Sequence, residues 1–262
     1  MRAKLTGIVL RTVDTGEADR VVTLLTRERG KVAAFARGAR ASRRRFGGSL
    51  EPFTLVSAEV RERSASELLG LESVTPVAAF GGIRGDLARI ACAGYAAELS
   101  RELVSDHEPH PDLFDLLSGY LAMLDAGPAR PAALRAFELG ALRVAGLSPR
   151  LDACARCGGA PPAERPVRFD PGQGGVLCEA CAPFAAPGTP SLSQPALAAL
   201  VHLSEGGLAR AATEVLAPEA GREARDALTA FLEHHLGLRL KARRFLDEVA
   251  PFLGEDAPTH RG

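Results

Sequence analysis

The chain has 262 residues, of which 46% are apolar and 24% charged, and its 32 basic and 32 acidic side chains give a formal net charge of zero. Such a chain is long enough for two or three small domains, and its composition is ordinary for a soluble globular protein. No apolar run approaches the roughly 18 residues of a membrane span, and the first residues lead into a strand pattern instead of a signal peptide, so we expect a cytoplasmic protein.

The basic side chains are unevenly distributed along the chain. Only Lys4, Lys31 and Lys241 are lysines and the other 29 are arginines, so the placement of an arginine tells more than its presence. Residues 1–64 contain 14 basic and 7 acidic side chains, a net charge of +7, whereas residues 65–262 contain 18 and 25, a net charge of −7. This asymmetry favours a surface for nucleic acid or an acidic partner in the N-terminal segment. The alternative is that these charges surround a small barrel and cancel locally.

The first 75 residues alternate between short β-rich runs and polar turns. The runs cover residues 5–13, 20–26, 31–37, 53–62 and 66–74. Five strands of this kind predict a small closed or nearly closed barrel. In the third run, one face carries Lys31, Phe35 and Arg37 and the other carries small apolar residues, a pattern that suits contact with a nucleic-acid backbone and its bases. Phe35 fits the core of a twisted barrel equally well, and both interpretations stay open.

The segment after the third run, ARGARASRRRFGGSLEPF at residues 36–53, combines five arginines with three glycines. Arginine forks neutralise phosphates without sequence preference, and glycines allow a loop to approach a backbone closely. We therefore predict that this segment contacts nucleic acid. The candidate phosphate contacts are Lys31, Arg37, Arg40, Arg43, Arg44 and Arg45, with Phe46 and Phe35 as weaker candidates for base stacking.

Helical spacing of apolar residues begins near residue 80 and resumes after residue 191, with a Pro- and Gly-rich insertion between the two helical sets. Ser191 and Gln194 fit a capping box at the start of the second set. The predicted domains are residues 1–79 for the barrel, 80–149 and 189–250 for the two parts of a helical domain, 150–188 for the insertion, and 251–262 for a flexible tail.

The insertion holds four of the five cysteines, Cys154, Cys157, Cys178 and Cys181. Their spacing, C-x₂-C-x₂₀-C-x₂-C, is typical of a zinc ribbon, in which two knuckles present four thiolates to one tetrahedral ion. The segment between the pairs predicts a hairpin with turn residues at 171–172 and 174–175. Two disulfides, a thioredoxin-type redox site and a catalytic zinc fit less well, since the last would need an open coordination position. We therefore expect one structural zinc ion.

Signatures of catalysis are sparse. The sequence contains no P-loop, H-E-x-x-H, G-x-S-x-G or dinucleotide-binding motif. The acidic turn DTGEAD at residues 14–19 is the one hint of a hydrolytic metal site, and a solvated loop explains it better because no second acidic cluster accompanies it. We expect a protein that is not an enzyme.

The order of these features resembles the RecO family of bacterial DNA repair proteins, and the resemblance covers essentially the whole chain. Its most specific pieces are residues 7–30, residues 30–53 with GKVAAFARGARASRRRFGGSLEPF, and residues 234–248 with HHLGLRLKARRFLDE. The resemblance implies an α+β fold, in which an N-terminal OB-fold barrel precedes a helical domain with an inserted zinc ribbon.

The resemblance also implies a function. RecO proteins are recombination mediators of the RecF pathway that bind single- and double-stranded DNA and anneal complementary strands. They help load RecA onto strands coated by single-strand-binding protein (SSB), work with RecR, contact the C-terminal tail of SSB, and need no nucleotide hydrolysis. Such a protein would be cytoplasmic and associated with the nucleoid, with no membrane partner.

Two alternatives stay open. Arg243 and Arg244 form a second basic spot, which suits DNA contact and the C-terminal end of a helix equally well. The whole chain, in turn, fits a non-enzymatic adaptor whose basic N-terminal segment recognises an acidic partner tail.

Overall fold

A computed structural model of the chain describes residues 2–63 and 66–249. They form two compact units, which meet in the sequence between Gly127 and Pro128. Within the described ranges, no helix is long and apolar enough to cross a membrane. The tail predicted for residues 251–262 lies outside the described residues.

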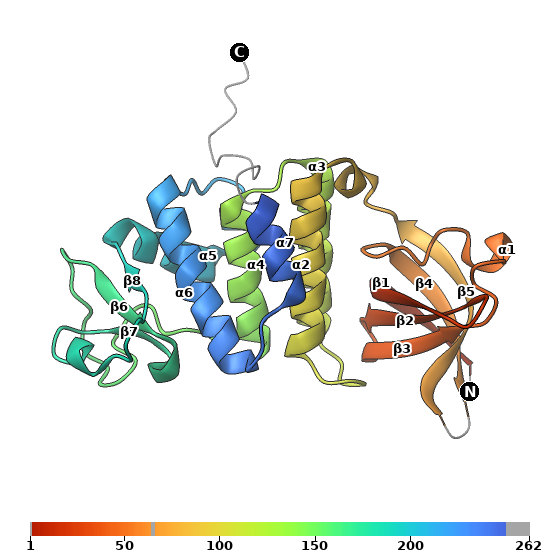
Figure 1. Ribbon diagram of the computed structural model, residues 1–262, viewed down its shortest axis with the longest axis horizontal. Coiled ribbons are helices and arrows are strands. Elements are labelled where there is room, and N and C mark those ends of the chain that lie inside the picture. The colour runs from red at the N-terminus through yellow and green to blue at the C-terminus, as the bar shows by residue number, and fades with distance from the viewer. Residues whose placement is uncertain (1, 64–65, 250–262) are drawn as a thin grey trace, which may run out of the picture. The chain divides into compact units, whose positions relative to one another are not determined.

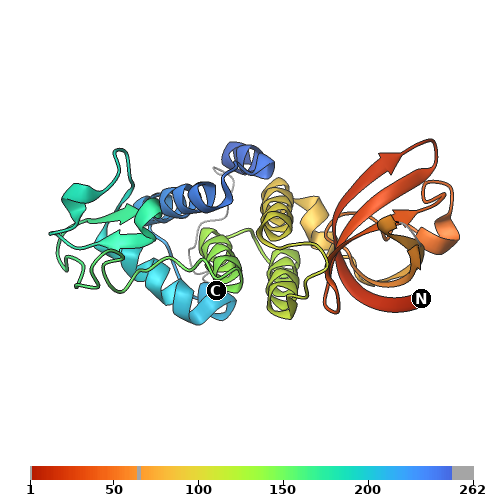
Figure 2. The same ribbon diagram turned by 90° about the horizontal axis from the view of Figure 1, so that it is seen from below.

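The first unit begins with a closed barrel of five strands, as predicted (Figures 1 and 2). The strands are β1 (Arg2–Thr15), β2 (Asp19–Thr26), β3 (Gly30–Ala36), β4 (Leu55–Arg63) and β5 (Ser66–Ala78). Their order around the barrel is β1-β2-β3-β5-β4, and β4 pairs with β1 to close it. Only the β3–β5 pairing is parallel. This OB-like barrel is followed by helices, so the predicted α+β fold class is confirmed.

The barrel interior is filled by the apolar face of each strand. In β3, buried and half-buried residues alternate throughout, with Val32, Ala34 and Ala36 inside, as the sequence pattern predicted. In β1, the register slips between Val9 and Arg11, a bulge that turns successive apolar residues inward and leaves Arg11 exposed. A period-two pattern does not anticipate such a slip.

Two long helices complete the first unit, α2 (Leu87–Leu103) and α3 (Pro111–Ala126), after the short turn η1 (Gly81–Gly85). The α2–α3 connection lies against the start of β3, where His107 N donates to the Lys31 carbonyl at 2.9 Å. Gly30 makes this approach possible, because its φ is +65° and a Cβ there would stand 1.7 Å from the Glu108 carbonyl oxygen.

The second unit combines helices with a small sheet. Its helices are α4 (Pro131–Val144), α5 (Gln194–Ala211), α6 (Pro218–Leu236) and α7 (Lys241–Val249). The insertion between α4 and α5 forms the ribbon, with β6 (Val167–Asp170), β7 (Gly175–Leu177) and β8 (Ser191–Leu192) in the order β7-β6-β8. The predicted hairpin is confirmed, with the turn η2 (Pro171–Gln173) at its tip. The ribbon packs on α6 through Phe169 and Phe231, whose ring centroids are 5.9 Å apart.

The predicted capping box is wrong. Ser191 lies in β8, where pairing with β6 keeps its backbone extended. Ser193 is the N-cap of α5 instead, and its Oγ accepts a hydrogen bond from Ala196 N at 3.4 Å. The side chain of Gln194 donates to two backbone carbonyls of the ribbon, so it joins α5 to the insertion.

Candidate nucleic-acid interface and metal centre

The arginine-rich segment forms a loop between β3 and β4, here called the arginine loop (residues 37–48). It contains the single helical turn α1 (Arg43–Phe46). Phe46 and Leu50 are 2% and 1% exposed and belong to the barrel core, so they anchor the loop from within. Thr12 Oγ1 donates to the Leu50 carbonyl at 2.6 Å and fixes the same end of the loop to β1.

The other end of the arginine loop is held by the turn between β1 and β2. Gly38 has a φ of +65°, and its N–H donates to Asp19 Oδ1 at 2.7 Å. The Arg40 N–H donates to the Ala18 carbonyl at 3.0 Å. Both ends are therefore fixed by hydrogen bonds, and the backbone presents its arginines from a defined position.

The predicted phosphate contacts divide by what their guanidinium groups already bind. Arg37 and Arg44 are exposed, and within the described residues their side chains form no hydrogen bond or ion pair. Arg40 Nη1 donates to the Glu17 carbonyl at 3.1 Å. Arg45 Nη2 donates to the Arg37 carbonyl at 2.7 Å, so Arg45 supports the loop. The side chain of Arg43 lies outside the described part of the chain.

Two predicted contacts have other roles in the structure. Lys31 Nζ donates to the Arg101 carbonyl at 2.7 Å and lies 3.3 Å from Asp106 Oδ1, so this ammonium group joins β3 to the end of α2. Phe46 is buried in the barrel core beneath the Arg45 guanidinium, which is centred 4.9 Å from the ring, and it has no face open to a base. Phe35 is half-buried.

Sequence reasoning missed Arg11. The bulge in β1 leaves it exposed, and no hydrogen bond or ion pair of its side chain occurs in the described part of the chain. It lies at a shallow hollow beside the arginine loop, lined by Arg11, Thr12, Val13, Asp14, Arg20, Leu50, Glu51 and Pro52. No signal in the sequence distinguishes Arg11 from Arg20, which is paired with Asp14 at 2.9 Å.

The four predicted metal ligands come together in the ribbon. The Sγ atoms of Cys154, Cys157, Cys178 and Cys181 all lie within 4.8 Å of one another. None of them forms a disulfide, and the Cys157 and Cys178 sulfurs are 3.6 Å apart. Four thiolates around tetrahedral zinc, at about 2.3 Å from the ion, stand about 3.8 Å apart. The cluster therefore fits one zinc-sized ion.

The pKa values of the thiols differ widely within the cluster. Burial raises the pKa of Cys181 to about 12, with further contributions from the three neighbouring thiols. Burial also acts to raise the pKa of Cys154, but hydrogen bonds from the backbone at Cys178, Cys157 and Arg156 outweigh it and lower the pKa to about 6. A bound dication removes this conflict because it stabilises all four thiolates together.

Comparison with known proteins identifies the family. The model of the recombination protein O N-terminal domain matches residues 1–80, and that of the C-terminal domain matches residues 84–244. The chain belongs to the RecO family. It is 75% identical over 253 residues to "DNA repair protein RecO" of Anaeromyxobacter dehalogenans, covering 97% of this chain and 99% of that protein.

More distant RecO relatives also match along nearly their whole length. The protein of the same name from Myxococcus xanthus is 50% identical over 245 residues, covering 93% of this chain and 96% of the relative. That of Geobacter sulfurreducens is 42% identical over 246 residues, covering 94% and 97%. The predicted family is thus confirmed.

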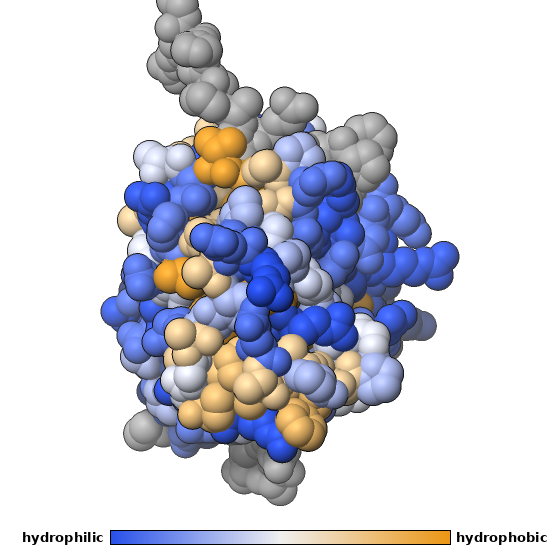
Figure 3. Space-filling view, turned by 90° about the vertical axis from the view of Figure 1, so that its left-hand side faces the viewer, coloured by the Kyte–Doolittle hydropathy of each residue, from blue (hydrophilic) through white to orange (hydrophobic). Residues whose placement is uncertain are grey.

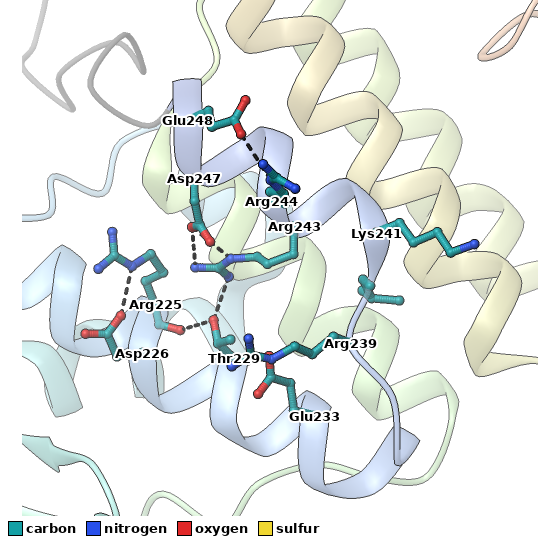
Figure 4. A pocket seen from close by; sticks show the side chains of 11 residues that line it. Arg225, Asp226, Thr229, Glu233, Arg239, Lys241, Arg243, Arg244, Asp247 and Glu248 are labelled. Carbon is teal, nitrogen blue, oxygen red and sulfur yellow. Dashed lines mark hydrogen bonds and ion pairs between the residues drawn. The ribbon is translucent and has the colours of Figure 1, made fainter.

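The second basic spot of this RecO-family chain is ion-paired. Arg243 lies 2.9 Å from Asp247 and its Nη1 donates to Thr229 Oγ1 at 2.5 Å, so it fastens α7 to α6 (Figure 4). Arg244 pairs with Glu248 at 3.3 Å on the exposed face of α7. Both are i,i+4 pairs within one helix, which stabilise the helix and reduce the positive charge available to DNA.

Proposed function

We propose that this chain binds DNA through the arginine loop, without sequence preference, on single and double strands. The observation that carries the proposal is the state of Arg37 and Arg44, which are exposed guanidinium groups with no partner among the described side chains, on a loop fixed at both ends. Arg11 extends this surface onto β1. Most of the other described barrel arginines are already paired with carboxylates.

The chemistry of such a surface is phosphate neutralisation. A guanidinium that is not paired within the protein can form bidentate hydrogen bonds to a phosphate and release condensed counterions. Because these contacts leave base edges free, two strands held in this way keep their Watson–Crick faces available while their mutual repulsion is screened. This supports a role in annealing complementary strands.

In repair, we propose the mediator role that the family implies. The chain would act in the RecF pathway with RecR, contact the C-terminal tail of SSB, and help load RecA onto SSB-coated strands. This work on chromosomal DNA would place it at the nucleoid in the cytoplasm. The four-cysteine cluster would hold one structural zinc ion, because four thiolates close the coordination shell and leave no position for a substrate.

The test is a titration of bare oligonucleotides across salt concentrations, with the double variant Arg37→Ala/Arg44→Ala. The loss of two phosphate contacts should weaken binding on the order of tenfold. It should also make the slope of log K against log salt shallower by about 1.4 on single strands and about 1.8 on duplex. Arg2→Ala/Arg61→Ala removes the same charge where both arginines pair with Glu72, and serves as the control. An unchanged slope in the arginine-loop variant refutes the assignment.

An adaptor for an acidic peptide is the second candidate. The hollow beside the arginine loop favours it, because Val13 and Pro52 there provide apolar contact next to Arg11. The same titration separates the two functions. An adaptor would bind an acidic peptide tightly and bare DNA not at all, whereas a DNA-binding protein binds the oligonucleotide at low salt with no partner present.

A further inference from the structure

Exposed aromatic rings are rare in this chain. It has no tryptophan, and both tyrosines are buried. Among the described phenylalanines, Phe184 is 62% exposed, and the next is Phe245 at 39%. The arginine loop offers no such ring, since Phe46 is 2% exposed. If bases of a single strand stack on the described part of this protein, Phe184 is the ring with the most surface to offer.

Phe184 is not alone on the ribbon surface. The guanidinium carbon of Arg156 lies 4.1 Å from the centroid of its ring, in a cation–π stack. Arg156 is exposed, and its side chain has no hydrogen bond or ion pair with any described residue. The planar guanidinium therefore covers one part of the ring and keeps its N–H donors available.

The two metal-binding knuckles bring this pair together. Arg156 lies between Cys154 and Cys157 in the first knuckle. Phe184 ends the turn η3 (Ala182–Phe184), which follows Cys181 of the second knuckle directly. The four-cysteine cluster thus brings the two segments that carry this pair next to each other.

The ribbon that carries the pair has no net charge. Residues 150–188 contain four basic and four acidic side chains, and Arg165 is paired with Glu179 at 3.4 Å. Figure 3 looks onto the ribbon side of the molecule and shows apolar side chains in several patches among hydrophilic ones. A surface with no net charge attracts phosphates little, so any contact with a strand here depends mainly on its bases.

We propose that the Arg156–Phe184 pair is a stacking platform for the unpaired bases of single-stranded DNA. A base stacks on the exposed ring or on the guanidinium plane, while the guanidinium edge donates to a base acceptor or a phosphate. Duplex DNA has no free base face, so the platform distinguishes single from double strands, whereas the arginine loop binds both. This inference rests on the proposed DNA binding and adds strand selectivity to it.

The experiment compares Phe184→Leu and Arg156→Ala with wild type on a labelled 20-nucleotide strand and on its duplex. Leucine keeps the apolar volume and removes the aromatic ring. Each variant should bind the single strand about 5- to 160-fold more weakly, the range for one lost base stack, with duplex affinity unchanged. Arg165→Ala, an exposed and ion-paired arginine of the same ribbon, is the control and should bind like wild type. The zinc content of each variant, expected to be unchanged, shows that the ribbon is intact.

The outcomes separate this inference from the proposed function. If the arginine-loop variant binds DNA more weakly than wild type and both ribbon variants bind single strands like wild type, the platform alone is overturned. A wild-type chain that binds neither oligonucleotide overturns both. An equal loss on single strand and duplex also overturns the platform, as does a ribbon variant that loses a protein partner while its DNA affinity is unchanged. A fluorescent base analogue in the strand, quenched by wild type and not by Phe184→Leu, is the supporting signal besides affinity.

Discussion

The barrel and the ribbon are both small β modules, and they are stabilised in different ways. Among the residues whose burial the structure describes, the barrel has a core of 16, almost all aliphatic, on strands of 7 to 14 residues. The buried cluster at the ribbon knuckles consists of Leu177 and three cysteines, and the ribbon strands have 2 to 4 residues. A large aliphatic core is sufficient to stabilise a fold, whereas a small module with so few buried side chains generally needs a metal ion.

This difference affects what each module can present to a partner. The barrel is held from inside, so its surface arginines are free to vary without loss of the fold. In the ribbon, Arg156 and Phe184 lie close in sequence to the cysteines of the four-cysteine cluster. The barrel therefore separates stability from binding, and the ribbon couples them.

The largest expected effect is the loss of the metal. Cys178→Ser, or a strong chelator, should reduce the zinc content from about one ion per chain to none and unfold the ribbon, because structural zinc contributes roughly 10–16 kcal/mol in modules that fold with it. Hydrogen exchange should show loss of protection within residues 150–190 and unchanged protection in β1 to β5. Cys92→Ser changes the one cysteine outside the cluster and should retain the metal. A metal-free chain whose ribbon amides stay protected would contradict the claim that the ribbon, unlike the barrel, needs a metal to fold.

A smaller effect is expected from removing one ring from each module. Phe46→Ala leaves a cavity in the barrel core and should lower the free energy of unfolding of the barrel by about 3–5 kcal/mol. Phe184→Ala removes an exposed ring and should change stability by less than about 1 kcal/mol. Denaturant unfolding, followed by exchange of β2 amides, measures both. Equal losses of stability would show that the two rings are not core and surface residues as described.

The smallest effect concerns Lys31, whose ammonium joins β3 to α2. Lys31→Met should destabilise the first unit by about 1 kcal/mol, because it removes the hydrogen bond to the Arg101 carbonyl and the ion pair with Asp106. The salt slope of DNA binding should remain that of wild type. Lys4→Met removes an exposed lysine that has no hydrogen bond or ion pair among the described residues, and should leave stability unchanged. A shallower slope in Lys31→Met alone would restore Lys31 as a phosphate contact.

Much of the fold could be predicted because it depends on patterns that are local in the sequence. Alternation in β3 indicated which face is buried, and turn residues marked the hairpin of the ribbon. The capping box failed because Ser191 and Ser193 are both acceptable caps locally, and pairing of Ser191 with β6 decided between them. Arg11 was missed because a bulge, which has no period, set its exposure.

The two candidate sites also differ in how much of each is determined by local sequence. The spacing of the four cysteines alone predicted the metal cluster, since two residues between ligands suffice to form a knuckle. The arginine loop was predicted as a segment, but not which of its cations are available. Arg37 and Arg45 look alike in the sequence. The Arg45 side chain donates to the Arg37 carbonyl, whereas the Arg37 side chain forms no hydrogen bond with any described residue. Whether an arginine is free depends on the acceptors that the folded loop brings within reach, such as the Arg37 carbonyl for Arg45 and the Glu17 carbonyl for Arg40. For the same reason, only the tertiary structure places Arg156 on Phe184.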